Sequence, residues 1–104
     1  MIVFYGELSC VRNRHAGDKI VFTSGSFDLT HLGHIRLLEA CKALGEVLVV
    51  AVGTDAEIQR DKGVGRPILD ERVRVKTIDA LKCVDYVLLN APHSVNLCPL
   101  DPVR

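Results

Sequence analysis

The sequence lacks tryptophan, contains a single methionine, and has aromatic side chains at only 5% of its 104 positions. It also lacks an excess of either charge, since 13 lysine and arginine residues balance 13 aspartate and glutamate residues. A chain without net charge is not expected to coat nucleic acid or a membrane surface through bulk charge. The apolar runs fall short of the roughly 18–20 residues that span a bilayer, and the N-terminus has no signal-peptide pattern. We therefore expect neither a nucleic-acid nor a membrane partner.

The cysteines form no metal-binding or disulfide pattern. Cys10, Cys41, Cys83 and Cys98 are widely spaced, with no C-x-x-C pair. This spacing suggests neither a zinc site nor a disulfide scaffold, so we expect reduced thiols and a cytoplasmic location.

The length corresponds to one domain. A composition of 48% hydrophobic and 25% charged residues is that of an ordinary globular protein.

Strand and helix patterns alternate along the chain. Three short apolar stretches rich in β-branched residues predict strands: residues 19–24, 46–53 and 84–89. Helices are predicted where apolar residues recur at helical spacing or where a favourable N-cap begins a turn: residues 31–44, 55–59, the stretch that follows Asp70, and a short one near 7–14.

This order of elements predicts an α/β fold, a Rossmann-like parallel sheet with flanking helices. We divide the single domain, residues 1–104, into an N-terminal extension (1–18), a catalytic core (19–89) and an irregular tail (90–104). In such sheets ligands bind beyond the carboxyl ends of the strands. The segment that links the first strand to the first long helix therefore lies where a ligand is expected.

That segment carries the sequence GSFDLTHLGH over residues 25–34. His31 and His34 are three residues apart and so share one face of the first helical turn. The unpaired N–H groups and the dipole of that turn favour an anion. Gly33 costs about 1 kcal/mol relative to alanine in a helix, but it lets a ligand lie against the backbone between the imidazoles. Gly25 allows the tight turn after the strand.

These residues resemble the nucleotidyltransferase superfamily that is marked by the H-x-G-H signature. The G-x-F-D that precedes the signature is similar to that of cytidylyltransferases and sugar-phosphate adenylyltransferases. The resemblance continues through K-G-x-x-R-P-I at residues 62–68 and C-V-D at residues 83–85. It covers residues 19–89 and is greatest to the adenylyltransferase domain of ADP-heptose synthase and to glycerol-3-phosphate cytidylyltransferase.

The resemblance implies transfer of a nucleoside monophosphate from an NTP to a small phosphorylated acceptor, such as a sugar or polyol phosphate, with release of pyrophosphate. ATP is favoured over CTP, and Mg²⁺ would bridge the triphosphate. The acceptor phosphate is already ionised, so the site needs hydrogen-bond donors and positive charge rather than a nucleophile or a strong base. By this resemblance the catalytic residues are His31, His34 and Lys62. Asp28 would orient the site or contact the acceptor, and the nucleotide or its phosphates would contact Gly25, Ser26, Phe27, Gly33, Arg66 and Arg72.

Several of these residues have an alternative interpretation. The two histidines could form a metal pair, but no third ligand is evident, and we predict no protein-held metal. The ring of Phe27 could anchor the core instead of stacking on a base. Asp55 and Asp70 suit helix caps, and Arg74 and Lys76 suit a solvated helix face.

Relatives usually continue beyond the third strand with a βα unit and a Ser/Thr-rich motif that binds the triphosphate. Nothing similar follows Asn90, so the chain is either truncated or divergent there, or a partner subunit supplies those functions. The alternative function is therefore a nucleotide-binding module with little or no turnover.

We also expect a homodimer. A domain of this size buries only a little over ~60% of its unfolded surface. Apolar residues run consecutively at 87–89, and others follow within 95–100. Contiguous apolar surface usually marks an interface, so the segment after Asp85 is expected to contribute to the contact.

Overall fold

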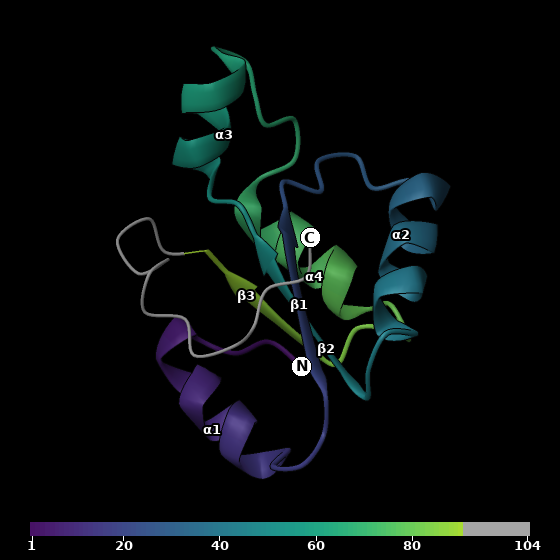
Figure 1. Cartoon of the computed structure of the whole chain (residues 1–104). Coiled ribbons are helices and arrows are strands. Elements are labelled where there is room, and N and C mark those ends of the chain that lie inside the picture. Colours follow the sequence, from purple (N-terminus) through teal and green to yellow (C-terminus); the bar gives the residue numbers. More distant parts are fainter. Residues whose placement is uncertain (91–104) are drawn as a thin grey trace.

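The computed structural model describes residues 1–90 and shows an open sheet with helices on both faces (Figure 1). Residues 91–104 lie outside the description, and with them Cys98 and most of the expected tail. The elements in chain order are a 3₁₀ helix η1 (Tyr5–Glu7), α1 (Leu8–Arg14), β1 (Ile20–Gly25), α2 (Leu32–Lys42), β2 (Val47–Val52), α3 (Asp55–Lys62), α4 (Glu71–Asp79) and β3 (Tyr86–Leu89).

The three strands form one parallel sheet in the order β1-β2-β3. The register places Ile20 of β1 beside Val47, and Val52 beside Leu89 of β3. All six residues of the central strand β2 are buried, as expected of a strand that is apolar on both faces. The predicted Rossmann-like α/β fold is thereby confirmed.

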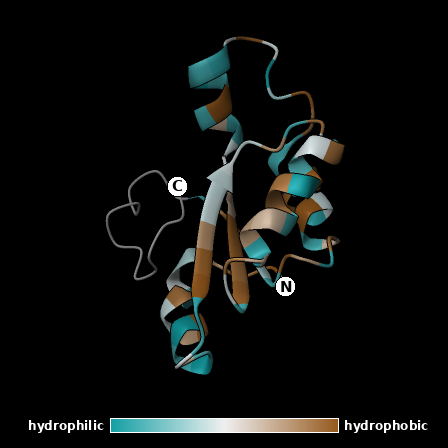
Figure 2. Cartoon of the chain, turned by 45° about the vertical axis from the view of Figure 1, so that its right-hand side comes forward, coloured by the Kyte–Doolittle hydropathy of each residue, from teal (hydrophilic) through white to brown (hydrophobic). Residues whose placement is uncertain are grey.

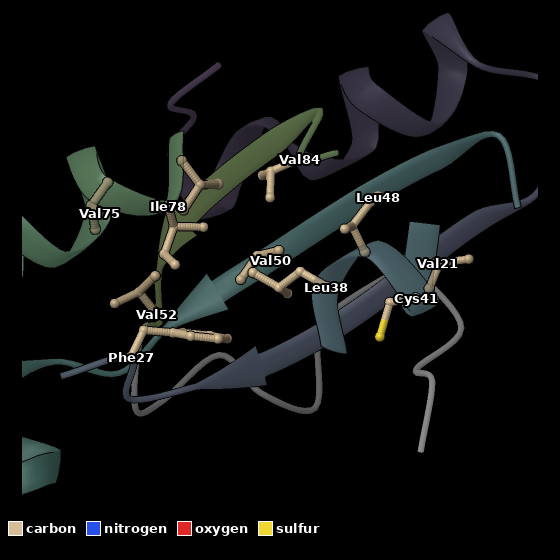
Figure 3. Close-up of a cluster of buried hydrophobic side chains, with 11 residues drawn as sticks. Val21, Phe27, Leu38, Cys41, Leu48, Val50, Val52, Val75, Ile78 and Val84 are labelled. Carbon is tan, nitrogen blue, oxygen red and sulfur yellow. The ribbon is translucent and has the colours of Figure 1, made fainter. Parts of the chain in front are cut away.

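Helices α2 and α4 cover one face of the sheet. Leu38 from α2 and Ile78 from α4 join Val50 and Val52 of β2 in a buried cluster (Figure 3). Figure 2 shows the same arrangement by hydropathy, with hydrophobic strands inside and hydrophilic residues on the helices. Because one side of each helix meets the sheet, their apolar residues recur at helical spacing.

The N-terminal extension covers the other face. Leu8 and Val11 of α1 are buried against β2 and β3. Ile2 forms a parallel bridge with Val87, and the N–H of Val3 donates to the Val87 carbonyl over 2.9 Å. Residues 1–11 are therefore an integral part of the sheet's packing.

This covering corrects one part of the dimer argument. Val87 and Leu88 were expected to leave apolar surface exposed, yet both have 0% exposure. The reason is that α4 packs on one face of β3 while the N-terminal extension packs on the other. The tail residues 95–100 fall outside the described part of the chain.

Within residues 1–90 no helix is long and apolar enough to cross a membrane. The cytoplasmic location stays a prediction.

Candidate functional site

The predicted site residues gather where β1 and β2 end. Both strands point toward the side of the molecule that holds α3 and the amino end of α2 (Figure 1). The segment 26–31 leaves β1 there, and α3 follows β2 after Gly53 and Thr54. The loop 63–70, which connects α3 to α4, returns to the same edge through hydrogen bonds to Asp28. Three connections thus meet at the carboxyl edge of the sheet, where ligands of such folds bind.

The structure brings His31 and His34 together at the start of α2. His31 is the N-cap residue, and its Nδ1 accepts a hydrogen bond from the Gly33 N–H over 2.9 Å. The Nδ1 of His34 accepts from the His31 N–H over 3.2 Å, and the ring centroids are 4.1 Å apart. Since both Nδ1 atoms are acceptors, each neutral ring carries its hydrogen on Nε2. The pair therefore presents two Nε2–H donors at a helix amino end.

The surroundings of His34 favour its neutral form. Partial burial lowers the pKa of His34 below its ordinary value of 6.5, and the neighbouring His31 and Lys62 lower it further. The ring also meets the edge of Phe27, with centroids 5.7 Å apart. A neutral ring keeps Nδ1 as an acceptor for the backbone, so the donor stays on Nε2.

The two site glycines make room for side chains of this chain itself. A Cβ on Gly33 would lie 2.7 Å from Cε1 of His31, and a Cβ on Gly25 would lie 2.9 Å from Cε2 of Phe27. The sequence argument had assigned the space at Gly33 to a ligand, whereas the structure fills it with the His31 ring. Phe27 is 4% exposed and belongs to the apolar core, so its ring is the core anchor of the alternative interpretation and is not available for stacking on a base.

Asp28 holds the loop 63–70. Its carboxylate accepts hydrogen bonds from the N–H groups of Ile68 (2.8 Å) and Leu69 (2.9 Å), and Arg66 lies 3.6 Å away. Burial by itself would raise the pKa of Asp28, but the two N–H donors and the nearby arginines, Arg66 and Arg74, lower it below 3.8. With 2% of its side chain exposed and two backbone N–H donors, Asp28 orients the loop 63–70 beside the site, and its contact with an acceptor stays a prediction.

Lys62 and Ser26 face each other across the site. Nζ of Lys62, at the end of α3, lies 3.3 Å from Oγ of Ser26. Both residues line a hollow of about 170 Å³, together with Glu57 and Asp61 of α3 and with Asn90. Ser24 lines it too, so the hollow combines one ammonium and two serine residues with two carboxylates and an amide.

Of the two arginines predicted to bind the nucleotide, one lies at the site and the other lies elsewhere. Arg66 belongs to the site through Asp28. Arg72 lies on α4 and lines a second hollow, of about 400 Å³, with residues 2–5 and Leu89. The structure shows no contact between Arg72 and the histidine pair.

Arg74 is the residue that the sequence argument missed. It was expected on a solvated helix face, yet its exposure is 0%. Its guanidinium donates to the main-chain oxygens of Ser26, Gly53 and Leu69 and pairs with Asp55. One signal was present in the sequence: Arg74 lies four residues before Ile78, which places both on one helix face. Asp70 caps α4 as expected, whereas the cap of α3 is Thr54 and not Asp55.

No three histidine, cysteine or acidic side chains within residues 1–90 are grouped to hold a metal ion. The hydrogen-bond donors gathered at the site are the Nε2–H groups of two imidazoles, an ammonium and the N–H groups at a helix amino end, and each of them suits a phosphate.

Comparison with known proteins gives matches over the same stretch. A family model described as Cytidylyltransferase-like matches residues 22–100. Bifunctional protein HldE from Desulfatibacillum aliphaticivorans is 55% identical over 83 residues, which are 80% of this chain and 17% of that protein. HldE from Citrifermentans bemidjiense is 46% identical over 78 residues, 75% of this chain and 16% of that protein. The chain thus spans about a sixth of these relatives.

A solved structure also matches. The lipopolysaccharide core biosynthesis protein from Thermoplasma volcanium GSS1 superimposes with a TM-score of 0.72 at 37% identity. The match covers 78% of this chain and 65% of that one. It supports the same fold and includes most of the described residues.

Proposed function

The chain belongs to the cytidylyltransferase-like family, and on that premise we propose that it is a nucleotidyltransferase. It transfers a nucleoside monophosphate from an NTP to a small phosphorylated acceptor and releases pyrophosphate. The observation that carries the proposal is the pair of Nε2–H donors of His31 and His34, which the backbone fixes side by side at the amino end of α2.

The donor pair suits the α-phosphate of the nucleotide. As the acceptor's phosphate oxygen attacks, negative charge accumulates on the α-phosphate oxygens and on the leaving pyrophosphate. Preorganised donors aimed at those oxygens lower the barrier, because they need no rearrangement during the reaction. His31 and His34 supply two such donors, the helix dipole adds to them, and Lys62 supplies a full positive charge. No proton has to be removed, so neutral imidazoles are sufficient.

We place the acceptor in the hollow of about 170 Å³. Its phosphate would lie toward Lys62 and Ser26, whose Nζ and Oγ are 3.3 Å apart. Its hydroxyl groups would donate to the carboxylates of Glu57 and Asp61 on the wall formed by α3. This combination of an ammonium with carboxylates favours a sugar or polyol phosphate.

Mg²⁺ enters the proposal with the triphosphate. The described residues provide no cage for it, and the carboxylate of Asp28 already accepts hydrogen bonds from two backbone N–H groups. Mg²⁺ commonly binds through substrate phosphates and waters. We favour ATP, with CTP next, because residues 62–68 and 83–85 resemble the adenylyltransferase pattern.

The test is pyrophosphate release with a panel of NTPs, sugar phosphates and polyol phosphates in the presence of Mg²⁺. His34→Ala is expected to lower turnover by roughly 100-fold or more, the usual cost of one transition-state donor. His15→Ala is the matched control, because His15 contacts Tyr86 on the opposite face of the sheet and should leave turnover unchanged.

One outcome would contradict the proposal. A folded wild type that releases no pyrophosphate with any substrate pair removes the catalytic function. Calorimetry with ATP, CTP and their diphosphates then distinguishes what remains: binding without release supports the nucleotide-binding module, and the absence of binding excludes both. The calorimetry is necessary because this chain spans only a small share of the relatives' length.

A further inference from the structure

Arg74 is the one charged side chain that is fully buried within residues 1–90. Its neighbours on α4, Val75 and Ile78, belong to the apolar core. A guanidinium that leaves water strongly destabilises a fold unless its N–H groups are hydrogen-bonded. An apolar side chain of similar volume often serves stability equally well or better. The contribution of this charge is therefore to be sought in the hydrogen bonds that it makes.

The first two partners of Arg74 lie where the strands end. Nη1 donates to the carbonyl of Ser26 over 2.8 Å and to the carbonyl of Gly53 over 2.6 Å. Ser26 directly follows β1, and Gly53 directly follows β2. One nitrogen atom therefore ties together the carboxyl ends of two neighbouring strands.

The other two partners belong to the remaining connections of the site. Nε donates to the carbonyl of Leu69 over 2.9 Å, and Nη2 donates to the carboxylate of Asp55 over 2.6 Å. Leu69 lies in the loop 63–70, whose N–H groups donate to the Asp28 carboxylate. Asp55 is the first residue of α3, the helix that ends at Lys62. The guanidinium thus contacts all three connections that meet at the site.

We propose that Arg74 is a positioning residue of the transfer site. Without touching substrate, it sets the separation between Ser26 and the helix that carries Lys62. The Lys62 Nζ to Ser26 Oγ distance of 3.3 Å depends on where these two segments begin, and Arg74 holds both beginnings. A misplacement of about 1 Å in a catalytic site can lower a rate by roughly 100-fold. This inference rests on the proposed nucleotidyl transfer.

Lysine cannot reproduce this arrangement. Arginine has five N–H donors in a planar fork, whereas the lysine ammonium has three on one compact atom. Arg74→Lys keeps the charge and most of the volume, but a single ammonium cannot reach Ser26, Gly53 and Leu69 together. We expect Arg74→Lys to fold with a kcat lowered by about tenfold to 100-fold, while the KM values for nucleotide and acceptor change by less than about threefold.

The experiment compares the wild type with Arg74→Lys, Asp55→Ala and Lys76→Gln. Lys76→Gln is the matched control, since it removes an exposed cation two residues further along α4 and should leave kcat unchanged. Asp55→Ala removes one partner of the guanidinium at a position with 42% of its side chain exposed. Asp55→Ala is expected to fold even if Arg74→Lys does not. Its kcat is expected to be lower than that of the wild type.

Amide hydrogen exchange is measured on the same samples. We expect exchange to become faster at residues 26–28, 53–56 and 63–70, and to stay unchanged in the centre of the sheet. An unaltered kcat in folded Arg74→Lys, or in Asp55→Ala if the lysine variant does not fold, overturns the inference. Exchange that quickens evenly along β1, β2 and β3 also overturns it, because Arg74 would then serve only the stability of the whole fold.

A wild type that releases no pyrophosphate with any substrate pair refutes the proposed function and the catalytic consequence of Arg74, but not the spacing of the three connections by its guanidinium. The exchange data then decide alone. Faster exchange confined to the three connections supports Arg74 as the residue that spaces them, and an even increase overturns it.

Discussion

Gly33→Ala should separate catalysis from stability. Gly33 is the second residue of α2, and an added Cβ would lie 2.7 Å from Cε1 and 3.0 Å from Nδ1 of His31. Non-bonded carbon atoms normally stay 3.5 Å or more apart, so one group must move. The His31 ring is the exposed and rotatable partner. It has to turn away, and it then loses the hydrogen bond from the Gly33 N–H.

Two opposing changes set the effect on stability. Loss of the N-cap hydrogen bond costs about 1 kcal/mol. Replacing a helical glycine by alanine recovers up to about 1 kcal/mol. The free energy of unfolding should therefore change by less than about 1 kcal/mol. Catalysis has no such compensation, because the Nε2–H donor of His31 leaves its place. The expected loss is roughly 100-fold in kcat, which corresponds to about 2.7 kcal/mol of activation free energy.

The assay is denaturant unfolding and pyrophosphate release on the same preparation. Gly6→Ala is the control, since a Cβ at Gly6 meets nothing within 4 Å and Gly6 has no positive φ. Full turnover in a folded Gly33→Ala variant would show that the His31 ring is not at the reaction centre. An unfolded variant would show that the backbone, and not the ring, takes up the clash.

Three further predictions concern protonation and assembly. Because the pKa of His34 is lowered from 6.5, the unfolded chain takes up the proton first, and the free energy of unfolding should fall as the pH drops below about 6.5. NMR titration should show Lys62→Gln raising that pKa, and an unmoved pKa would contradict the charge interaction. The pKa of Asp28 in the folded chain is below 3.8. The ionised carboxylate therefore stabilises the fold above pH 3.8, and this stabilisation is lost as the pH falls through the lower pKa of the folded chain. Asp28→Asn should flatten the loss of stability below about pH 4, and an unchanged pH profile would refute this reasoning. The homodimer stays a prediction that now rests on Phe4 and Ile2, which are 82% and 47% exposed. Light scattering at micromolar concentration should give twice 11.4 kDa and Phe4→Ser half of that, whereas a monomeric wild type would refute the dimer.

The sequence alone determined the local elements and their order. The uninterrupted apolar run of 46–53 predicted a strand buried on both faces, and β2 is that strand. The periodicity of 31–44 predicted α2, although the helix is shorter at both ends, since His31 caps it and the last turn stops at Lys42. These features depend on neighbouring residues, so a pattern of period two or 3.6 is enough to find them. The expected position of the candidate site followed from the same order, because ligands bind where parallel strands end.

Only the tertiary structure decided which side chains share the site and how they are held. Arg74 reads as a surface cation by its charge, yet its partners come from segments up to 48 residues away, and no local pattern records them. The glycine at position 33 predicted close approach to the backbone, but the fold determined that the approaching group is the His31 ring. The packing of residues 1–11 over β3 could not be predicted from the sequence either. The segment is short and has little periodicity, so its position depends on the sheet that it covers. Burial and hydrogen-bond pairing are properties of several segments together, whereas periodicity belongs to one segment at a time.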